Sequence, residues 1–186
     1  MDRRRPLTLL AACAVLASLA ACGSTPEDAI DTELDRFGLR DSSATRVIDT
    51  LDATNDDRES PLRASVRPDS LVLTVGDQER TLAMPKDRTY LSIAPFREQT
   101  HDCFNHNLTT CQGEQVKKSF TVTLTDAQGR TVVDEKATTW DNGFLGLWVP
   151  RDVTGTLTVS GEAGSGSIPV STDANAPTCL TTVKLS

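Results

Sequence analysis

The sequence predicts an α+β protein in which a short helical N-terminal region precedes an antiparallel β-sandwich-like C-terminal domain. Between residues 26 and 53, apolar residues recur at the spacing of an amphipathic helix. From Leu71 onward the pattern changes to alternation, with many valines and threonines and a turn every 8 to 12 residues. Because no helical pattern interrupts these short strands, we expect antiparallel pairing in a sandwich or a small barrel.

The first helix is expected to begin at Thr25-Pro26-Glu27-Asp28, which supplies a capping hydroxyl, a proline at the first helical position and acids in the first turn. Ile30, Leu34 and Phe37 follow at helical spacing, and Gly38 ends the pattern. This segment is therefore predicted to be a short amphipathic helix.

A second helix is expected to begin between Asp41 and Ser43 and to run to about Ala53, with an apolar stripe formed by Ala44, Val47, Ile48 and Leu51. Two short helices of this kind cannot bury their stripes alone. They must pack on each other, on the downstream domain, or on a second copy of the chain, so a homodimer formed through these helices is one expectation.

Candidate strands lie at residues 70–75, 80–84, 90–94, 120–125, 130–135, 144–149, 156–160, 167–170 and 180–185. The clearest hairpin turns at Asp126-Ala127-Gln128-Gly129, and Asp141-Asn142-Gly143 gives a second hairpin signal. These assignments leave residues 95–118 as a long loop. Loops of this length in compact domains are usually functional.

The N-terminus is typical of a bacterial export signal, because Arg3-Arg4-Arg5 precede an apolar run from Leu7 to Ala21. An apolar run of about 15 residues is short for a membrane span, which needs about 20. Small residues precede Cys22, which is followed by Gly23, and this pattern predicts cleavage and lipidation at Cys22. We expect a signal peptide at 1–21, a lipidated tether at 22–25, a helical region at 26–60 and a β-rich domain at 61–186.

The charge of the chain argues against nucleic acid as a partner. The full sequence has a net charge of −7, and removing residues 1–21, which carry +2, leaves −7 − 2 = −9. The sequence also contains no glycine-rich phosphate loop, nucleophile elbow or acid pair. The sequence therefore makes no positive case for a hydrolase. Because lipidation is predicted at Cys22, we expect a membrane-tethered protein of the bacterial cell envelope.

The loop at 95–118 contains the segment HDCFNHNLTTC, which holds both histidines of the chain. His101, Cys103, His106 and Cys111 alternate there as H-x-C-x2-H-x4-C, and Cys179 precedes the last candidate strand. Once Cys13 leaves with the signal and Cys22 takes the lipid, three cysteines remain. An odd number in an exported protein implies a reactive thiol, an intermolecular bridge or a metal ligand.

Three interpretations of this cluster stay open. Cys103 and Cys111 could form a disulfide that closes a small loop while Cys179 lies buried, but this leaves the histidines unexplained. The cysteines could instead cycle between thiol and disulfide, although no C-x-x-C occurs. Metal binding accounts for all five residues and is favoured. Thiolates with imidazoles select copper or zinc, with Cu(I) suited to the sulfur donors, and thiols can also reduce Cu(II) to Cu(I).

Other residues near the cluster have expected roles as well. Asp102 and Glu114 are candidates to orient a histidine ring, which metal sites commonly need, and solvated loop carboxylates are the equal alternative. Met84, the one methionine left after signal removal, lies in a candidate strand and is expected to pack in the core rather than bind metal.

Three blocks of this sequence resemble the CueP family of periplasmic copper-binding proteins: YLSIAPFREQTHDCFNHNLTTCQGE (90–114), DNGFLGLWVPRDVTGTLTV (141–159) and PTCLTT (177–182). The resemblance covers roughly residues 27–186 and is weakest in the acidic helical part. This sequence differs from the family in one respect. The family is associated with soluble members, whereas this chain carries a lipidation motif.

The resemblance implies an extracytoplasmic copper-binding protein of the copper-tolerance system, with its site in the β-rich domain. It implies Cys103, Cys111 and Cys179 as thiol ligands, and His101 and His106 as further ligands or close neighbours. We therefore expect a lipid-anchored protein that is not an enzyme and that sequesters copper as Cu(I). A copper-receiving enzyme or exporter is the expected partner. A thiol-based Cu(II) reductase and a zinc-binding scaffold are the alternatives.

Overall fold

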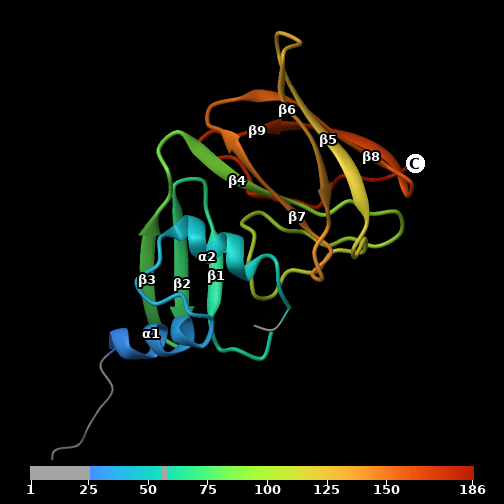
Figure 1. The fold of residues 1–186 in the computed structure, drawn as a ribbon. Coiled ribbons are helices and arrows are strands. Elements are labelled where there is room, and N and C mark those ends of the chain that lie inside the picture. Colours follow the sequence, from blue (N-terminus) through green and yellow to red (C-terminus); the bar gives the residue numbers. More distant parts are fainter. Residues whose placement is uncertain (1–25, 56–57) are drawn as a thin grey trace, which may run out of the picture.

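The computed structural model describes residues 26–55 and 58–186, so the expected signal peptide and the lipidation site at Cys22 lie outside the described residues. Its first part consists of α1 (Pro26–Arg36), α2 (Ala44–Leu51), β1 (Arg63–Val66), β2 (Ser70–Val75) and β3 (Gln78–Ala83). The three strands form an antiparallel sheet in the order β1-β2-β3. Figure 1 shows both helices lying against this small sheet.

Both helices begin and end where local sequence signals place them. Gly38 adopts a positive φ of 65° after α1, and the N–H of Leu39 returns to the carbonyl of Leu34 at 2.9 Å, which closes the helix. Ser43 caps α2, since its side chain accepts a hydrogen bond from the backbone N–H of Arg46. The expected helix boundaries are therefore confirmed to within about two residues.

The apolar stripes of α1 and α2 are buried against the β1–β3 sheet. One hydrophobic cluster contains Ile30 and Leu34 of α1, Val47, Ile48 and Leu51 of α2, and Ala64, Val66, Leu71 and Leu73 of the sheet. Of the three ways in which the helices could bury these stripes, the chain uses packing on its own strands. A second copy is not needed for their burial.

The second part contains two more sheets. The middle sheet has the order β10-β4-β7, formed by β10 (Cys179–Leu180), β4 (Arg88–Ile93) and β7 (Leu145–Pro150). The outer sheet has the order β6-β5-β8-β9, formed by β6 (Thr131–Thr138), β5 (Ser119–Asp126), β8 (Thr154–Gly161) and β9 (Gly164–Ser171). The two sheets enclose a second hydrophobic cluster, to which every one of these strands except β6 contributes buried residues.

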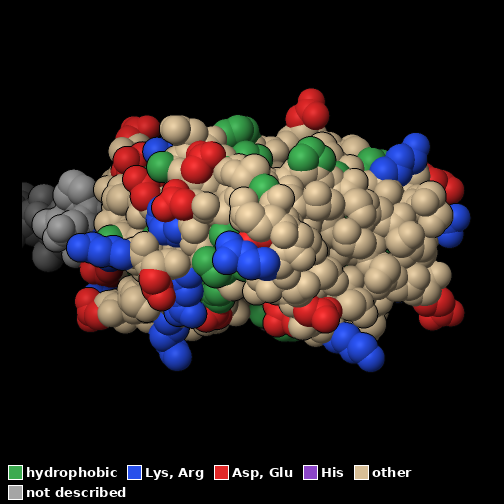
Figure 2. All heavy atoms as spheres, turned by 90° about the horizontal axis from the view of Figure 1, so that it is seen from above, with side chains coloured by type: hydrophobic (Ala, Val, Ile, Leu, Met, Phe, Trp, Pro, Cys, Tyr) green, Lys and Arg blue, Asp and Glu red, His purple; other side chains and the backbone are tan. Residues whose placement is uncertain are grey.

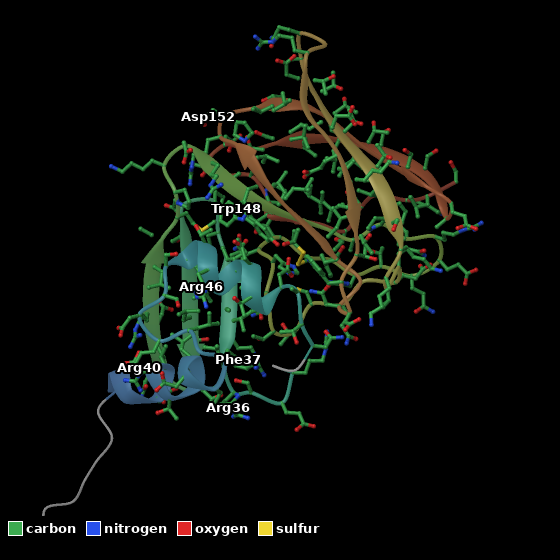
Figure 3. All side chains as sticks on the ribbon, in the orientation of Figure 1. Arg36, Phe37, Arg40, Arg46, Trp148 and Asp152 are labelled. Carbon is green, nitrogen blue, oxygen red and sulfur yellow. A yellow bond between two sulfur atoms is a disulfide. The ribbon has the colours of Figure 1, made fainter. Side chains whose placement is uncertain are left out.

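The middle sheet is covered on both faces, and this places the functional loop. Along β4, Leu91 and Ile93 point into the core shared with the outer sheet, whereas Tyr90 belongs to the cluster of the helices. Trp148 of β7 also packs against the helical cluster, and Figure 3 shows it next to α2. A strand buried on both faces loses the polar alternation expected of a half-exposed strand.

The predicted α+β class with a sandwich-like β domain is confirmed, with three differences in detail. β1 was not expected, because its four residues Arg63–Val66 are too short to give a strand pattern. The expected strand at 180–185 shortens to Cys179–Leu180, which pairs with β4 in parallel. The turn at Asp141-Asn142-Gly143 is present, but it joins the outer sheet to the middle sheet, so the strands on its two sides do not form the expected hairpin.

Charged side chains gather on the end of the molecule that carries the helices and β1–β3, whereas the face over the sandwich shown in Figure 2 is mostly uncharged. Among the described residues, no helix has both the length and the apolar character that crossing a membrane requires.

Candidate metal centre

The loop at 95–118 is held by backbone hydrogen bonds from two sides. On one side, the N–H of Val66 in β1 donates to the carbonyl of His106 at 2.7 Å, and the N–H of Leu108 donates to the carbonyl of Ala64. On the other side, the N–H groups of Thr178 and Cys179 donate to the carbonyl of Phe104 at 2.9 and 3.1 Å. The loop therefore joins the first sheet to the start of β10.

This arrangement brings the three cysteines together. Cys103 and Cys179 form a disulfide with a Cα–Cα distance of 5.6 Å across 76 residues of sequence, and Figure 3 shows it as a yellow bond between sulfur atoms. Cys111 is the free cysteine of the described residues, and its sulfur lies 3.6 Å from that of Cys103. The alternative disulfide between Cys103 and Cys111 is not the one present. The shared carbonyl of Phe104 brings the backbone of Cys179, rather than that of Cys111, next to Cys103.

His106 completes the cluster and is wholly buried. Its Nδ1 atom lies 3.8 Å from the sulfur of Cys179. The ligand atoms of Cys103, His106, Cys111 and Cys179 all lie within 4.8 Å of one another. Four of the five residues expected as ligands thus converge on one point, inside a small apolar group formed by Ala94 and Phe144.

His101 is not part of this convergent group. Its side chain is exposed and lines an open pocket of about 290 Å³ together with Gln99, Thr100, Gln112, Gly113 and Glu114. Its ring centroid lies 6.3 Å from that of Phe144, which in turn packs on His106. The role of His101 as a ligand stays a prediction.

A carboxylate that the sequence did not single out holds the buried histidine. Asp52, directly after α2, is fully buried, and its Oδ1 atom lies 2.8 Å from Nε2 of His106. The hydroxyl of Tyr90 donates to Oδ2 of Asp52 at 2.6 Å, and the amide of Asn142 donates to Oδ1 at 3.0 Å. Asp52 is one of eleven carboxylates between residues 27 and 59, and no local signal separates it from the others.

Glu114, one of the two carboxylates considered as candidates to orient a histidine, is used elsewhere. Glu114 accepts hydrogen bonds from the backbone N–H groups of Arg97, Glu98 and Gln99 at 3.2, 2.9 and 2.8 Å, so it fixes the start of the long loop. Asp102 is exposed. Asp52 orients the buried ring of His106 instead, because hydrogen bonds from Tyr90 of β4 and Trp148 of β7 hold the end of α2 beside this ring.

A glycine makes room for the Tyr90 hydroxyl. Gly146 in β7 lies under the end of the Tyr90 side chain, and a Cβ atom at this position would collide with the hydroxyl oxygen and the adjacent ring carbon.

A second carboxylate of α2 also contacts the middle sheet. One turn before Asp52, Asp49 accepts a hydrogen bond from the indole N–H of Trp148 at 2.8 Å. The end of α2 is therefore fixed to the middle sheet by two carboxylates.

The burial and charge of these groups shift their pKa values together. Burial disfavours the charged ring, but the adjacent Asp52 carboxylate outweighs it and raises the pKa of His106 to about 9. Burial also opposes ionisation of Asp52, yet His106 and the donors from Tyr90 and Asn142 hold the pKa of this carboxyl below its usual value. For Cys111, burial is again outweighed by His106, which lowers the pKa of the thiol. The fold thus shifts the pKa of each of these three groups in the direction of its charged form.

The chemistry of the site depends on the state of its sulfur atoms. With the disulfide formed, Cys111 and His106 remain as free donors, and a disulfide sulfur is a weak ligand. With the disulfide reduced, three thiolates and one imidazole face the same point, and such a donor set favours Cu(I) or zinc over hard cations. The arrangement can therefore combine metal binding with a two-electron redox change of its sulfur atoms.

Comparison with known proteins agrees with this geometry. A model of the family described as "Periplasmic copper-binding protein CueP" matches residues 46–184. Among solved structures, a crystal structure of "S.CueP" is similar, with 39% sequence identity and a TM-score of 0.78, and the match covers 84% of this chain and 96% of that chain. No curated protein matches. The match spans β1 to β10, the long loop and Asp52, and on this basis the chain belongs to the CueP family of periplasmic copper-binding proteins.

Proposed function

We propose that this protein captures copper as Cu(I) outside the cytoplasm, through the reduced sulfurs of Cys103, Cys111 and Cys179 and through Nδ1 of His106. The single observation that carries the proposal is the convergence of these four donors within 4.8 Å. Soft thiolates stabilise a soft monovalent ion, and a buried apolar setting limits its oxidation by solvent species. Sequestration of this kind would serve copper tolerance or delivery to a copper-receiving enzyme or exporter.

The same proposal places the protein on the membrane surface of the bacterial envelope. The support is the sequence pattern at Cys22, where small residues and Gly23 flank the cysteine after an apolar run. With lipid on Cys22, most of the chain should fractionate with membranes. Replacing Cys22 with Ser should release it to the soluble periplasmic fraction, whereas replacing Cys13 with Ser should not. Release of the unaltered protein by salt alone would contradict lipid anchoring.

A role as a Cu(II) reductase is the second candidate, and the disulfide between Cys103 and Cys179 favours it. Oxidation of two thiols to a disulfide supplies two electrons and two protons. One disulfide formed therefore reduces two Cu(II) to two Cu(I). The third thiol, Cys111, and His106 would remain beside the bond to hold one of the ions.

The test of copper capture uses the chain with Cys13→Ser and Cys22→Ser, so that the described cysteines are the only ones. After anaerobic reduction, the protein is titrated with Cu(I) against a coloured Cu(I) chelator, and separately with Zn(II). We expect one Cu(I) per chain, held more tightly than zinc and lost in Cys103→Ser and Cys179→Ser. Three titratable thiols with no Cu(I) retained would overturn the proposal.

A matched control and a second measurement sharpen the result. Met84, the other sulfur-containing residue of the described chain, is buried in the helical core, so Met84→Leu should leave Cu(I) binding unchanged. His101→Ala tests the remaining candidate ligand, and loss of affinity would add it to the site.

To test the reductase role, the reduced protein is mixed with Cu(II) without another reductant. Two Cu(I) formed per disulfide would support this role, and continued turnover with added thiol would make it catalytic.

A further inference from the structure

Asp52 lies where a charged carboxylate destabilises the fold unless it is paired and hydrogen-bonded. It is the C-cap residue of α2, at the end of the helix where the dipole disfavours negative charge, and its side chain is fully buried. Asp49, one turn earlier on the same helix, is exposed and bonds to Trp148. Of these two acids, only Asp52 is removed from water.

Three donors from different parts of the fold stabilise this buried charge. The hydroxyl of Tyr90 comes from β4, the amide of Asn142 from the turn before β7, and Nε2 of His106 from the long loop. The amide of Asn142 also donates to the backbone carbonyl of Asp52 at 3.0 Å. Both carboxylate oxygens are therefore held in place before any metal arrives.

The ring of His106 is held by its neighbours in a way that leaves one nitrogen facing the sulfurs. It packs on Phe144, with ring centroids 4.5 Å apart and the rings tilted by 48°. Its backbone N–H donates to the hydroxyl of Thr178 at 3.1 Å, and its carbonyl accepts from Val66. Asp52 occupies Nε2, so Nδ1 is the remaining ring atom, and it faces the sulfur of Cys179.

We infer that Asp52 is a positioning residue of the copper site: by holding the proton on Nε2 of His106, it presents Nδ1 to the three sulfurs as the nitrogen ligand. A carboxylate behind a ligating histidine fixes the ring and strengthens its donor atom. This inference rests on the proposed copper-binding function. It also makes α2 part of the site, because the helix delivers the carboxylate.

Affinity measurements on a matched pair of variants test the inference, in the chain with Cys13→Ser and Cys22→Ser. Asp52→Asn keeps the size of the side chain but removes its charge, and should weaken Cu(I) binding about 10- to 100-fold. Asp49→Asn makes the same change one helical turn away at the surface and should alter binding less than about twofold. Equal Cu(I) affinities for Asp52→Asn and the parent would overturn the inference.

A second measurement needs no change at Asp52 and is independent of whether the variant folds. Cu(I) has a filled d shell, so nuclear magnetic resonance can follow the ring protons of the loaded protein. We expect a downfield, slowly exchanging Nε2 proton in both the metal-free and the Cu(I)-loaded chain, assigned by its loss in His106→Gln. Disappearance of this proton on loading, with a proton found on Nδ1 instead, would show that copper binds Nε2 and would overturn the inference.

The outcomes separate this inference from the proposed function. If the parent chain retains no Cu(I), copper capture itself fails. If Cu(I) binding is lost in His106→Gln but unchanged in Asp52→Asn, copper capture stands and the positioning role fails. If Asp52→Asn lowers the melting temperature while affinity and the Nε2 resonance stay the same, Asp52 is structural only, and the inference is again overturned.

Discussion

The sulfur of Cys111 lies 3.6 Å from that of Cys103, while Cys103 is bonded to Cys179. A free thiol in contact with a disulfide is placed to exchange with it, so Cys111 is a second possible partner of Cys103. The pairing seen here leaves Cys111 next to His106, which lowers the pKa of its thiol.

The first prediction concerns this pairing. In the oxidised chain with Cys13→Ser and Cys22→Ser, a thiol reagent under denaturing conditions should label one cysteine per chain, and three after reduction. Quenching at acidic pH, which stops exchange because thiolates are protonated, and then mapping peptides by mass spectrometry should find Cys103 joined to Cys179. A peptide joining Cys103 to Cys111 as the main species would contradict the structure.

The second prediction is that the disulfide stabilises the folded protein mainly because it closes a long loop. For a loop closed across 76 residues, the chain-entropy model gives about 4 kcal/mol of unfolding free energy. In the Cys111→Ser background, where Cys103 has no second cysteine with which to pair, Cys179→Ser should lower the free energy of unfolding by about this amount in urea titrations. Cys111→Ser, which leaves the disulfide in place, is the control and should cost far less.

The third prediction is a pH dependence of stability in the metal-free protein, measured in Cys111→Ser so that this thiol does not titrate. With Cys111 present, the folded-state pKa of His106 is about 9, and Asp52, the larger of the causes that raise it, keeps it above the unfolded value of about 6.5 in this variant. The stabilisation from the ion pair with Asp52 is therefore complete below about pH 6.5 and is lost as the pH rises towards the folded-state pKa. The expected loss of unfolding free energy is at most about 3 kcal/mol.

At acidic pH the stability depends on the partner residue, Asp52, and it decreases as the pH falls rather than as it rises. The pKa of Asp52 is lowered by the fold, so its contribution is present above its unfolded pKa and is lost as the pH falls below about 4. His106→Gln should remove the decline between pH 6.5 and 9. A decline of equal size in that variant would show that other groups cause it.

The fourth prediction compares two small substitutions at paired positions of the middle sheet. Gly146→Ala should displace the Tyr90 hydroxyl from Asp52 and lower the free energy of unfolding by roughly 1 to 3 kcal/mol. Its neighbour across the strands, Ser92, is fully buried and has a hydroxyl oxygen with no hydrogen-bond partner. Ser92→Ala should therefore leave stability unchanged or raise it by up to about 1 kcal/mol. Thermal unfolding of the pair checks both, and a tolerated alanine at 146 would contradict the close packing.

Much of the fold follows from short-range patterns that the sequence displays. The helix at Ala44–Leu51 was predicted because four apolar residues recur on one face after a capping serine, and both properties act within a few residues. The hairpin of β5 and β6 was predicted for the same reason, since its turn and alternation are local. β1 escaped detection because its pairing with β2 and with Asn107 of the long loop, rather than its own four residues, makes it a strand.

The sequence by itself predicted an exported chain, and it determined that helices precede strands and that both histidines lie with Cys103 and Cys111 in one long loop. Only the tertiary structure decided that Cys103 bonds with Cys179, that His106 rather than His101 joins the sulfurs, and that Asp52 stands behind the ring. The physical reason is that local patterns report propensity and periodicity. The meeting of side chains from α2, the loop and β10 depends instead on how two hydrophobic cores pack around the middle sheet.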